Sequence, residues 1–194
     1  MSRIERVFAR GGPVFIGFTV AGDPDMERSF FAATAMIDAG ADMLEIAVPY
    51  SDPVADGPVI ERAHHRALRA GTRPVDVFLL LRRLRDYAPD LPLVLFTYYN
   101  IVYRRGVDRF FSEAAAAGAD GLLIVDLPVE ESEEVAPHAA RYGIDRIALI
   151  APTTSPERQH AILREASGFV YLISLEGVTG ERDHLPPGLA GLVG

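Results

Sequence analysis

Two carboxylates lie close together in the sequence LEIAVPYSDPVADGP, which runs from Leu44 to Pro58. Glu45 lies inside an apolar, strand-like run, and Asp56 lies in the proline-rich loop that follows it. Burying an unpaired carboxylate costs several kcal/mol, on the order of polar transfer energies, so Glu45 must be paired, protonated or used in a reaction. Burial would raise the pKa of Glu45, whereas exposure would keep Asp56 ionised, and two such carboxylates can work as an acid/base pair.

Each carboxylate also has a purely structural interpretation. Glu45 could form a buried ion pair with an arginine, or accept a hydrogen bond from Tyr98 or Tyr171. Asp56 could cap the helix predicted directly after it, and Asp52 could form a turn. The position of Glu45 near the carboxyl end of its strand favours chemistry, because barrel enzymes carry their catalytic groups there.

Residues near other strand ends could complete a ligand site. Phe18, Tyr98 and Tyr171 are each typical of core packing when taken singly, but together they could form an apolar slot for a flat ring. The sequence LISLEGVTGER places Thr179 and Gly180 in a polar, glycine-rich segment. Such a segment is either an ordinary surface loop or one that covers a ligand and donates backbone amides to an anion.

The residue types that the sequence lacks limit the reactions that it could catalyse. The chain has no Cys, Trp or Lys, so all 19 basic residues are Arg. Disulfides, thiolate nucleophiles and lysine Schiff bases are therefore excluded for these residues. We predict no metal site, because His64 and His65 point to different sides of a helix and His138, His160 and His184 stand alone.

Charge and hydropathy limit the partners. The formal net charge of −8 is spread along the chain and argues against a nucleic-acid or anionic-membrane surface. The N-terminal sequence lacks the apolar core of a signal peptide, and no apolar stretch has membrane length. We therefore predict a cytoplasmic protein.

Apolar, β-type runs alternate with amphipathic segments, which is the pattern of βα units around a parallel sheet. Six strands are predicted, over 14–20, 43–48, 91–98, 121–125, 147–151 and 169–174. The first predicted helix has Asp23 as its N-cap and Pro24 at its first position. Further helices are predicted over 58–70, 74–87, 107–117, 130–142 and 155–166. In the first of these helices, Met26, Phe30, Ala33 and Ile37 form one apolar stripe.

These elements predict an α/β fold of the TIM (β/α)8 barrel type. The strands are apolar almost throughout, so both faces of the sheet are covered, as in a doubly wound sheet or a barrel. A barrel has eight units and typically about 250 residues, so we expect residues 1–194 to form a single, C-terminally truncated barrel domain of six units. Alternation along the second strand then points Glu45 into the barrel interior. Such an open barrel is expected to be poorly folded or prone to aggregation in isolation.

Five sequence blocks occur in order across essentially the whole chain: FTVAGDPD, LEIAVPYSDPVADGPVIERAHHRAL, LFTYYNIVYRRGVDRFF, VDLPVEES and YLISLEGVTG. Together they resemble the α subunit of tryptophan synthase. The second block is highly specific. The chain departs from the family at two positions: Val20 stands where the family often has Thr, and Ala47 stands where it often has Gly. The resemblance implies a TIM-barrel lyase that cleaves indole-3-glycerol phosphate to indole and glyceraldehyde 3-phosphate, a retro-aldol reaction in tryptophan biosynthesis.

The resemblance also implies roles for particular residues. Glu45 would be the general acid/base that protonates the indole ring carbon and takes the proton of the glycerol hydroxyl. Asp56 would accept the indole N–H and stabilise the charge that develops on the ring. The remaining substrate contacts would come from Phe18, Tyr98 and Tyr171 around the indole, Gly180 near the phosphate, and Thr179 on a loop that closes over Asp56.

A partner is implied as well. Loops with Asp52, Pro53 and Pro128 resemble the surface that docks the β subunit, in an α2β2 heterotetramer. Pyridoxal phosphate is expected only in that partner, and no cofactor is expected in this chain. A non-catalytic α-like subunit that binds and regulates a β partner is the alternative. Another phosphate-handling barrel, such as an isomerase of the same pathway, would leave the SDPVADGP loop unexplained.

Overall fold

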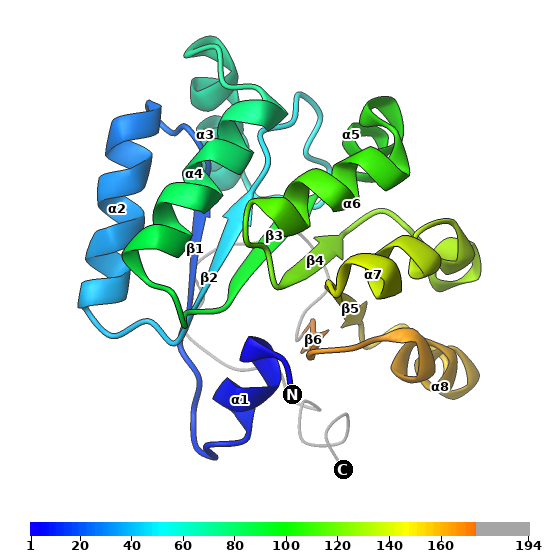
Figure 1. Cartoon of the computed structure of the whole chain (residues 1–194). Helices are drawn as coiled ribbons and strands as arrows, with labels where there is room; N and C mark the ends of the chain where they lie inside the picture. Colours follow the sequence, from blue (N-terminus) through cyan, green and yellow to red (C-terminus); the bar gives the residue numbers. More distant parts are fainter. Residues whose placement is uncertain (174–194) are drawn as a thin grey trace.

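Six parallel strands form one sheet in the order of the chain, from β1 to β6 (Figure 1). The computed structural model describes residues 1–173. The strands are β1 (Ile16–Val20), β2 (Met43–Ala47), β3 (Leu93–Thr97), β4 (Gly121–Ile124), β5 (Asp145–Ile150) and β6 (Val170–Leu172). All six predicted strands are confirmed, with ends that differ by one or two residues.

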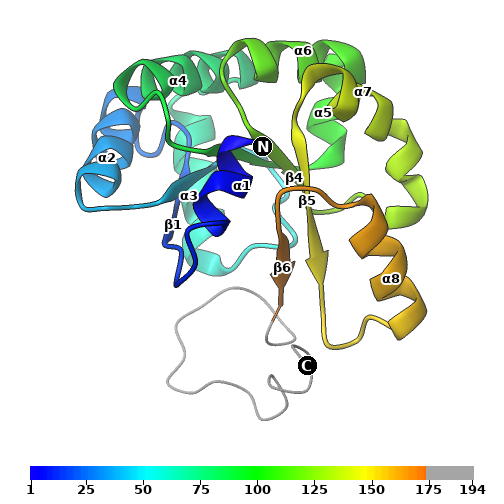
Figure 2. The same cartoon turned by 60° about the horizontal axis from the view of Figure 1, so that its bottom comes forward.

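The helices lie mainly along the convex side of this sheet, where α2, α4, α6, α7 and α8 form an outer layer (Figure 2). The helices are α1 (Arg3–Phe8), α2 (Met26–Asp38), α3 (Pro58–Arg69), α4 (Pro74–Tyr87), α5 (Tyr99–Arg105), α6 (Val107–Ala116), α7 (Ala136–Tyr142) and α8 (Pro156–Glu165), with a 3-10 helix η1 (Val129–Glu134). The apolar stripe predicted for α2 is confirmed, because its residues pack on the main core.

The side chains of β2 alternate between two cores, as a strand period of two requires. Leu44 and Ile46 are fully buried in the larger core, which α2, α4 and α6 share. Met43 is buried in a second core on the concave side, beside Val94 of β3. Glu45 follows the parity of Met43, so the prediction that it points into the barrel interior is confirmed.

Strong curvature of the sheet gives it the shape of a half-barrel (Figure 2). The hydroxyl of Tyr171 on β6 reaches Glu45 on β2 at 3.2 Å, although three strands lie between them in the sheet. A flat sheet would separate these strands by about 19 Å, from a spacing of about 4.8 Å between neighbours. The TIM-barrel prediction, with six βα units, is confirmed.

Two helices were not predicted, and one predicted helix is divided. Helix α1 is short and begins with a capping box between Ser2 and Glu5, and α5 follows directly on β3. The segment 130–142 forms η1 and then α7, instead of one helix. Pro137 lies in the first turn of α7 and has no N–H for the preceding turn, so the α-helix begins there.

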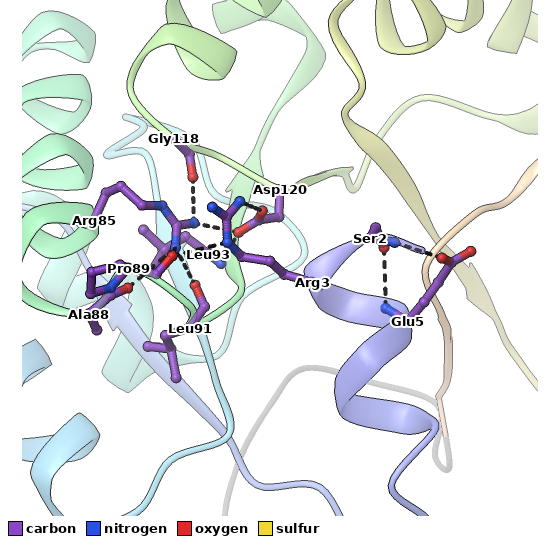
Figure 3. A network of polar contacts seen from close by, with 10 residues as sticks. All are labelled: Ser2, Arg3, Glu5, Arg85, Ala88, Pro89, Leu91, Leu93, Gly118 and Asp120. Carbon is purple, nitrogen blue, oxygen red and sulfur yellow. Dashed lines mark hydrogen bonds and ion pairs between the residues drawn. The ribbon is translucent and has the colours of Figure 1, made fainter.

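Helix α1 is tied to the amino-terminal edge of the sheet by a network around Asp120 (Figure 3). Asp120 accepts hydrogen bonds from Arg3 at 2.8 Å, from Arg85 at 2.5 Å and from the backbone N–H of Leu93 at 2.8 Å. Arg85 also donates to the carbonyl of Gly118 and to three carbonyls after α4. This network joins α1, α4, β3 and β4 at the edge opposite Asp56.

The start of α2 differs from the prediction. Asp25, not Asp23, is the N-cap, and its carboxylate accepts the N–H of Arg28 at 2.9 Å. Asp23 instead forms a bidentate ion pair with Arg66 of α3, with both contacts at 2.7 Å. The sequence pattern favoured Asp23, the first Asp of DPD, as the N-cap. In the structure Asp23 pairs with α3, and Asp25 caps the helix.

Candidate active site

Glu45 is the only carboxylate on β2, and it is 94% buried, with 6% of its surface exposed. Its Oε2 accepts a hydrogen bond from Tyr171, and its Oε1 is buried without a partner among residues 1–173. Burial raises the pKa of Glu45 to about 7, against the hydrogen bond from Tyr171, which lowers it, and together with the negative charge of Asp56, which raises it further. The carboxyl group therefore exchanges a proton near neutral pH.

Asp56 is also buried, which contradicts the prediction that it is exposed. Its Oδ2 accepts a hydrogen bond from Tyr98 at 2.8 Å. It does not cap α3 either, because Gly57 is the N-cap and makes no side-chain capping bond. The middle of the loop 48–57 is largely exposed, but its last residues are buried, and this places Asp56 within reach of Tyr98 instead of leaving it in solvent.

Tyr98 is positioned at the end of β3 to hold this loop. Its hydroxyl donates to Asp56 and accepts the backbone N–H of Ala55 at 3.2 Å. Burial, and then the hydrogen bond to Asp56, raises the pKa of Tyr98, so its hydroxyl stays protonated and remains a donor. Tyr98 thus links the β2–α3 loop to the β3 edge of the site.

Aromatic rings continue from Asp56 to β1. Phe18 is the neighbour of Glu45 in the β1–β2 register, and its ring packs edge-on to Phe96 at 5.6 Å between centroids. Phe96 contacts Tyr98 at 6.2 Å, and Tyr98 stacks on Tyr50 at 4.7 Å. The sequence analysis did not identify Phe96 or Tyr50, although Phe96 lies two residues before Tyr98 and strand alternation places the two on the same face.

The structure therefore brings five of the predicted site residues to one end of the half-barrel: Phe18, Glu45, Asp56, Tyr98 and Tyr171. Thr179 and Gly180 lie outside the described residues. Of the predicted docking residues, Asp52 is exposed, Pro128 is half-buried, and Pro53 is buried. The adjacent Val54, with 79% of its surface exposed, presents the apolar surface of this loop instead.

Within residues 1–173, no group of three or more His, Asp or Glu side chains has an arrangement that could hold a metal ion. In the same part of the chain, no helix has the length and apolar character needed to cross a membrane.

A cavity of about 490 Å³ lies elsewhere, between β4, β5, η1 and α8. Its charged lining residues have partners, since Arg158 contacts Glu130, Arg146 contacts Glu165, and Asp126 accepts the backbone N–H of Tyr99. It contains neither carboxylate of the candidate site. We therefore assign the chemistry to the carboxyl edge of the sheet, where parallel barrels carry their active sites.

The fold and the carboxylate pair define a class, namely TIM-barrel α/β proteins with two buried carboxylates at the carboxyl edge of the sheet. The family model described as "Tryptophan synthase alpha chain" matches residues 4–194. A tryptophan synthase α chain of Methanoregula boonei is 56% identical over 188 residues, which are 96% of this chain and 71% of that protein. The α chain of Carboxydothermus hydrogenoformans is 49% identical over 197 aligned residues, covering 100% of this chain and 73% of that protein. The chain belongs to the tryptophan synthase α chain family, which acts in tryptophan biosynthesis.

Solved structures agree with this assignment. Tryptophan synthase of Mycobacterium tuberculosis has a TM-score of 0.87 and 39% identity, covering 93% of this chain and 70% of that chain. The tryptophan synthase complex of Pyrococcus furiosus has a TM-score of 0.78 and 41% identity, covering 82% of this chain and 65% of that chain.

Proposed function

We propose that this protein is a lyase that cleaves indole-3-glycerol phosphate to indole and glyceraldehyde 3-phosphate by carboxylate acid/base chemistry. Family membership supports the reaction class, and the buried pair of Glu45 and Asp56 supplies the groups that the reaction needs. We also propose that residues 1–194 belong to one barrel domain and that the protein works in the cytoplasm.

Glu45 carries out both proton transfers in this proposal. Its protonated carboxyl group donates a proton to C3 of the indole ring, which leaves a positive charge on the ring nitrogen. The carboxylate then takes the proton of the adjacent glycerol hydroxyl. The C–C bond breaks as the aldehyde carbonyl forms, and its electron pair restores the aromatic ring. The proton given to C3 stays on indole, and the proton taken from the hydroxyl leaves Glu45 protonated, as it was at the start of the cycle.

Asp56 acts on the other side of the ring. Its carboxylate accepts the indole N–H, and it stabilises the positive charge that protonation at C3 creates. The aromatic wall of Phe18 and Tyr98 provides a flat apolar surface for the indole. We assign Tyr171 to the same slot, and Thr179 and Gly180 to the substrate-covering segment.

One observation carries the proposal: the carboxyl group of Glu45 is buried in the barrel interior, and this burial raises its pKa to about 7. A group that must give and then take a proton works best when its pKa lies near the working pH. An ordinary glutamate, with a pKa of 4.5, would be almost fully ionised there and a poor proton donor.

The test is indole release from indole-3-glycerol phosphate by the complete natural polypeptide. Glu45→Gln keeps the size of the side chain and removes the transferable proton, so kcat should fall by about 1,000-fold or more, within the range for loss of general acid/base catalysis. Glu61→Gln, at an exposed position of α3, is the matched control and should retain activity. Near-normal activity of Glu45→Gln would remove the assigned role.

We further propose a tryptophan synthase β subunit as partner in an α2β2 assembly, with pyridoxal phosphate held by that subunit and none by this chain. The exposed Asp52 and Val54 on the β2–α3 loop support docking close to the site. The alternative function, a non-catalytic subunit that binds and regulates the β partner, uses the same surface. Binding of a β subunit with no indole release by the unaltered protein would favour this alternative.

A further inference from the structure

His64 has no part in the acid/base steps, yet its ring is fully buried beside one of the two carboxylates. It lies on α3, on the face that also buries Ala63 and Ala67 against the small core near Val20 and Ala47. The adjacent His65 is only half-buried and contacts the carbonyl of Ser51 at 3.3 Å. The two histidines therefore differ completely in their surroundings.

The backbone fixes the tautomer of His64. The N–H of Tyr50 donates to Nδ1 of His64 at 3.2 Å, so Nδ1 must carry a lone pair and no proton. The proton of the neutral ring then lies on Nε2. A hydrogen bond to one ring nitrogen in this way determines what the other nitrogen can do.

The Nε2 atom of His64 points to Asp56. It lies 3.2 Å from Oδ2, and both side chains are at least 96% buried. The N–H is not well aligned with the oxygen, and Nε2 has no hydrogen bond to any of residues 1–173. Asp56 is therefore its nearest available acceptor, and contacts of this kind often become aligned only when the substrate binds.

Tyr98 and His64 approach the same oxygen of Asp56. Tyr98 donates to Oδ2 at 2.8 Å, and Tyr50, which binds Nδ1 of His64, stacks on the Tyr98 ring. His64 thus lies on α3 and Tyr98 directly after β3, and both contact Tyr50 of the loop after β2. Oδ2 therefore has one hydrogen bond, from Tyr98, and a second potential donor at 3.2 Å, in Nε2 of His64. Once both donate to Oδ2, the carboxylate is held from two sides and Oδ1 is left for another partner.

We propose that His64, as the neutral Nε2–H imidazole, is a positioning residue that orients Asp56 so that Oδ1 receives the N–H of the substrate ring. This inference rests on the proposed role of Asp56 and adds a residue and a tautomer to it. The imidazole transfers no proton. It holds the carboxylate in the geometry that stabilises charge on the ring.

The first test measures the tautomer directly in the complete natural polypeptide, labelled with ¹⁵N-histidine, by long-range ¹H–¹⁵N correlation. His64 should show the neutral Nε2–H pattern, and Asp56→Asn should shift its Nε2 resonance while that of His160 on α8 stays unchanged. A proton on Nδ1, in the neutral or the charged ring, would overturn the inference. So would an Nε2 resonance that does not respond to Asp56→Asn.

The second test separates positioning from packing. His64→Leu removes the donor, and kcat for indole release should fall by about 10- to 100-fold, the range for one hydrogen bond to a charged group. KM should change little, because the charge that Asp56 stabilises develops only in the transition state. His64→Gln places an amide N–H near Oδ2 and should recover most of kcat, and His160→Leu on exposed α8 is the control.

Equal losses in His64→Leu and His64→Gln, with thermal unfolding confirming that both are folded, would overturn the positioning role. If His64→Leu does not fold, the positioning role is tested by the measured tautomer of His64 and by comparing kcat of His64→Gln with that of the unaltered protein. Failure of the proposed function is recognised separately, because the unaltered protein would then release no indole. The response of the His64 resonance to Asp56→Asn does not depend on activity, so it would still test the contact between the two side chains.

Discussion

Glu45 should make the protein less stable as the pH rises through neutrality, and Glu45→Gln should remove this dependence. In the folded protein, burial raises the pKa of Glu45 from 4.5 to about 7. The folded state therefore holds the proton more tightly than the unfolded chain. Between these two pKa values the folded state binds more protons, so the free energy of unfolding falls as the pH rises.

The size of the effect follows from the same two values. Each pKa unit corresponds to about 1.4 kcal/mol, so the whole difference is about 3 kcal/mol. Roughly 2 to 3 kcal/mol of this should be lost between pH 5 and pH 8, because the unfolded carboxyl group is already partly ionised at pH 5. Gln cannot ionise, and its carbonyl oxygen can still accept the hydrogen bond of Tyr171. Relative to the unaltered protein, the variant should gain about that amount of stability between the two pH values.

Urea unfolding of both proteins at a series of pH values measures this difference, and the slope of the stability difference against pH is the quantity to compare. Comparing slopes cancels the constant cost of placing an amide where the buried Oε1 lies without a partner. Glu61→Gln on α3 is the matched control and should follow the unaltered protein. Parallel stability curves for Glu45→Gln and the unaltered protein would refute the argument that Glu45 is protonated through desolvation.

Three further changes have clear expected outcomes. Tyr171→Phe removes the donor that lowers the pKa of Glu45, so this pKa should rise by about one unit, as measured by ¹³C titration of the carboxyl group; an unchanged titration would contradict the contact. Gly22→Ala should lower the free energy of unfolding, measured with denaturant, by about 2 kcal/mol or more, because Gly22 has φ +80° and a Cβ there would clash with Oγ1 of Thr72. Asp120→Ala leaves two arginines without their carboxylate and should cost about 3 to 5 kcal/mol in denaturant unfolding, whereas a loss under 1 kcal/mol would show that the network is unimportant.

Local patterns were sufficient for most of the fold. Strand alternation identified both faces of β2 and the interior direction of Glu45, because a period of two allows only one assignment when one face is wholly apolar. Where the pattern was weak, prediction failed: α1 and α5 have six and seven residues, too few for a helical period to stand out.

The tertiary structure decided what the carboxylates contact. The sequence alone identifies Glu45 and Asp56 as a possible pair, but it does not say that Asp56 is buried and accepts a hydrogen bond from Tyr98. The distance in sequence is the physical reason, since Tyr98 is 42 residues from Asp56 and Tyr171 is 126 residues from Glu45. The pairing of β2 with β3 brings Tyr98 to the loop after β2, and the curvature of the sheet brings Tyr171 to Glu45.

His64 shows the same division between sequence and structure. In the sequence it is one of two adjacent histidines, and helical geometry says only that they face different sides. Burial, the N–H of Tyr50 and the carboxylate of Asp56 distinguish it from His65, and all three come from the packing of α3 on the loop after β2. The sequence therefore determined which residue types could do chemistry and on which elements they lie. The protonation of Glu45 and the orientation of Asp56 depend on burial and on partners from distant strands, which only the folded half-barrel supplies.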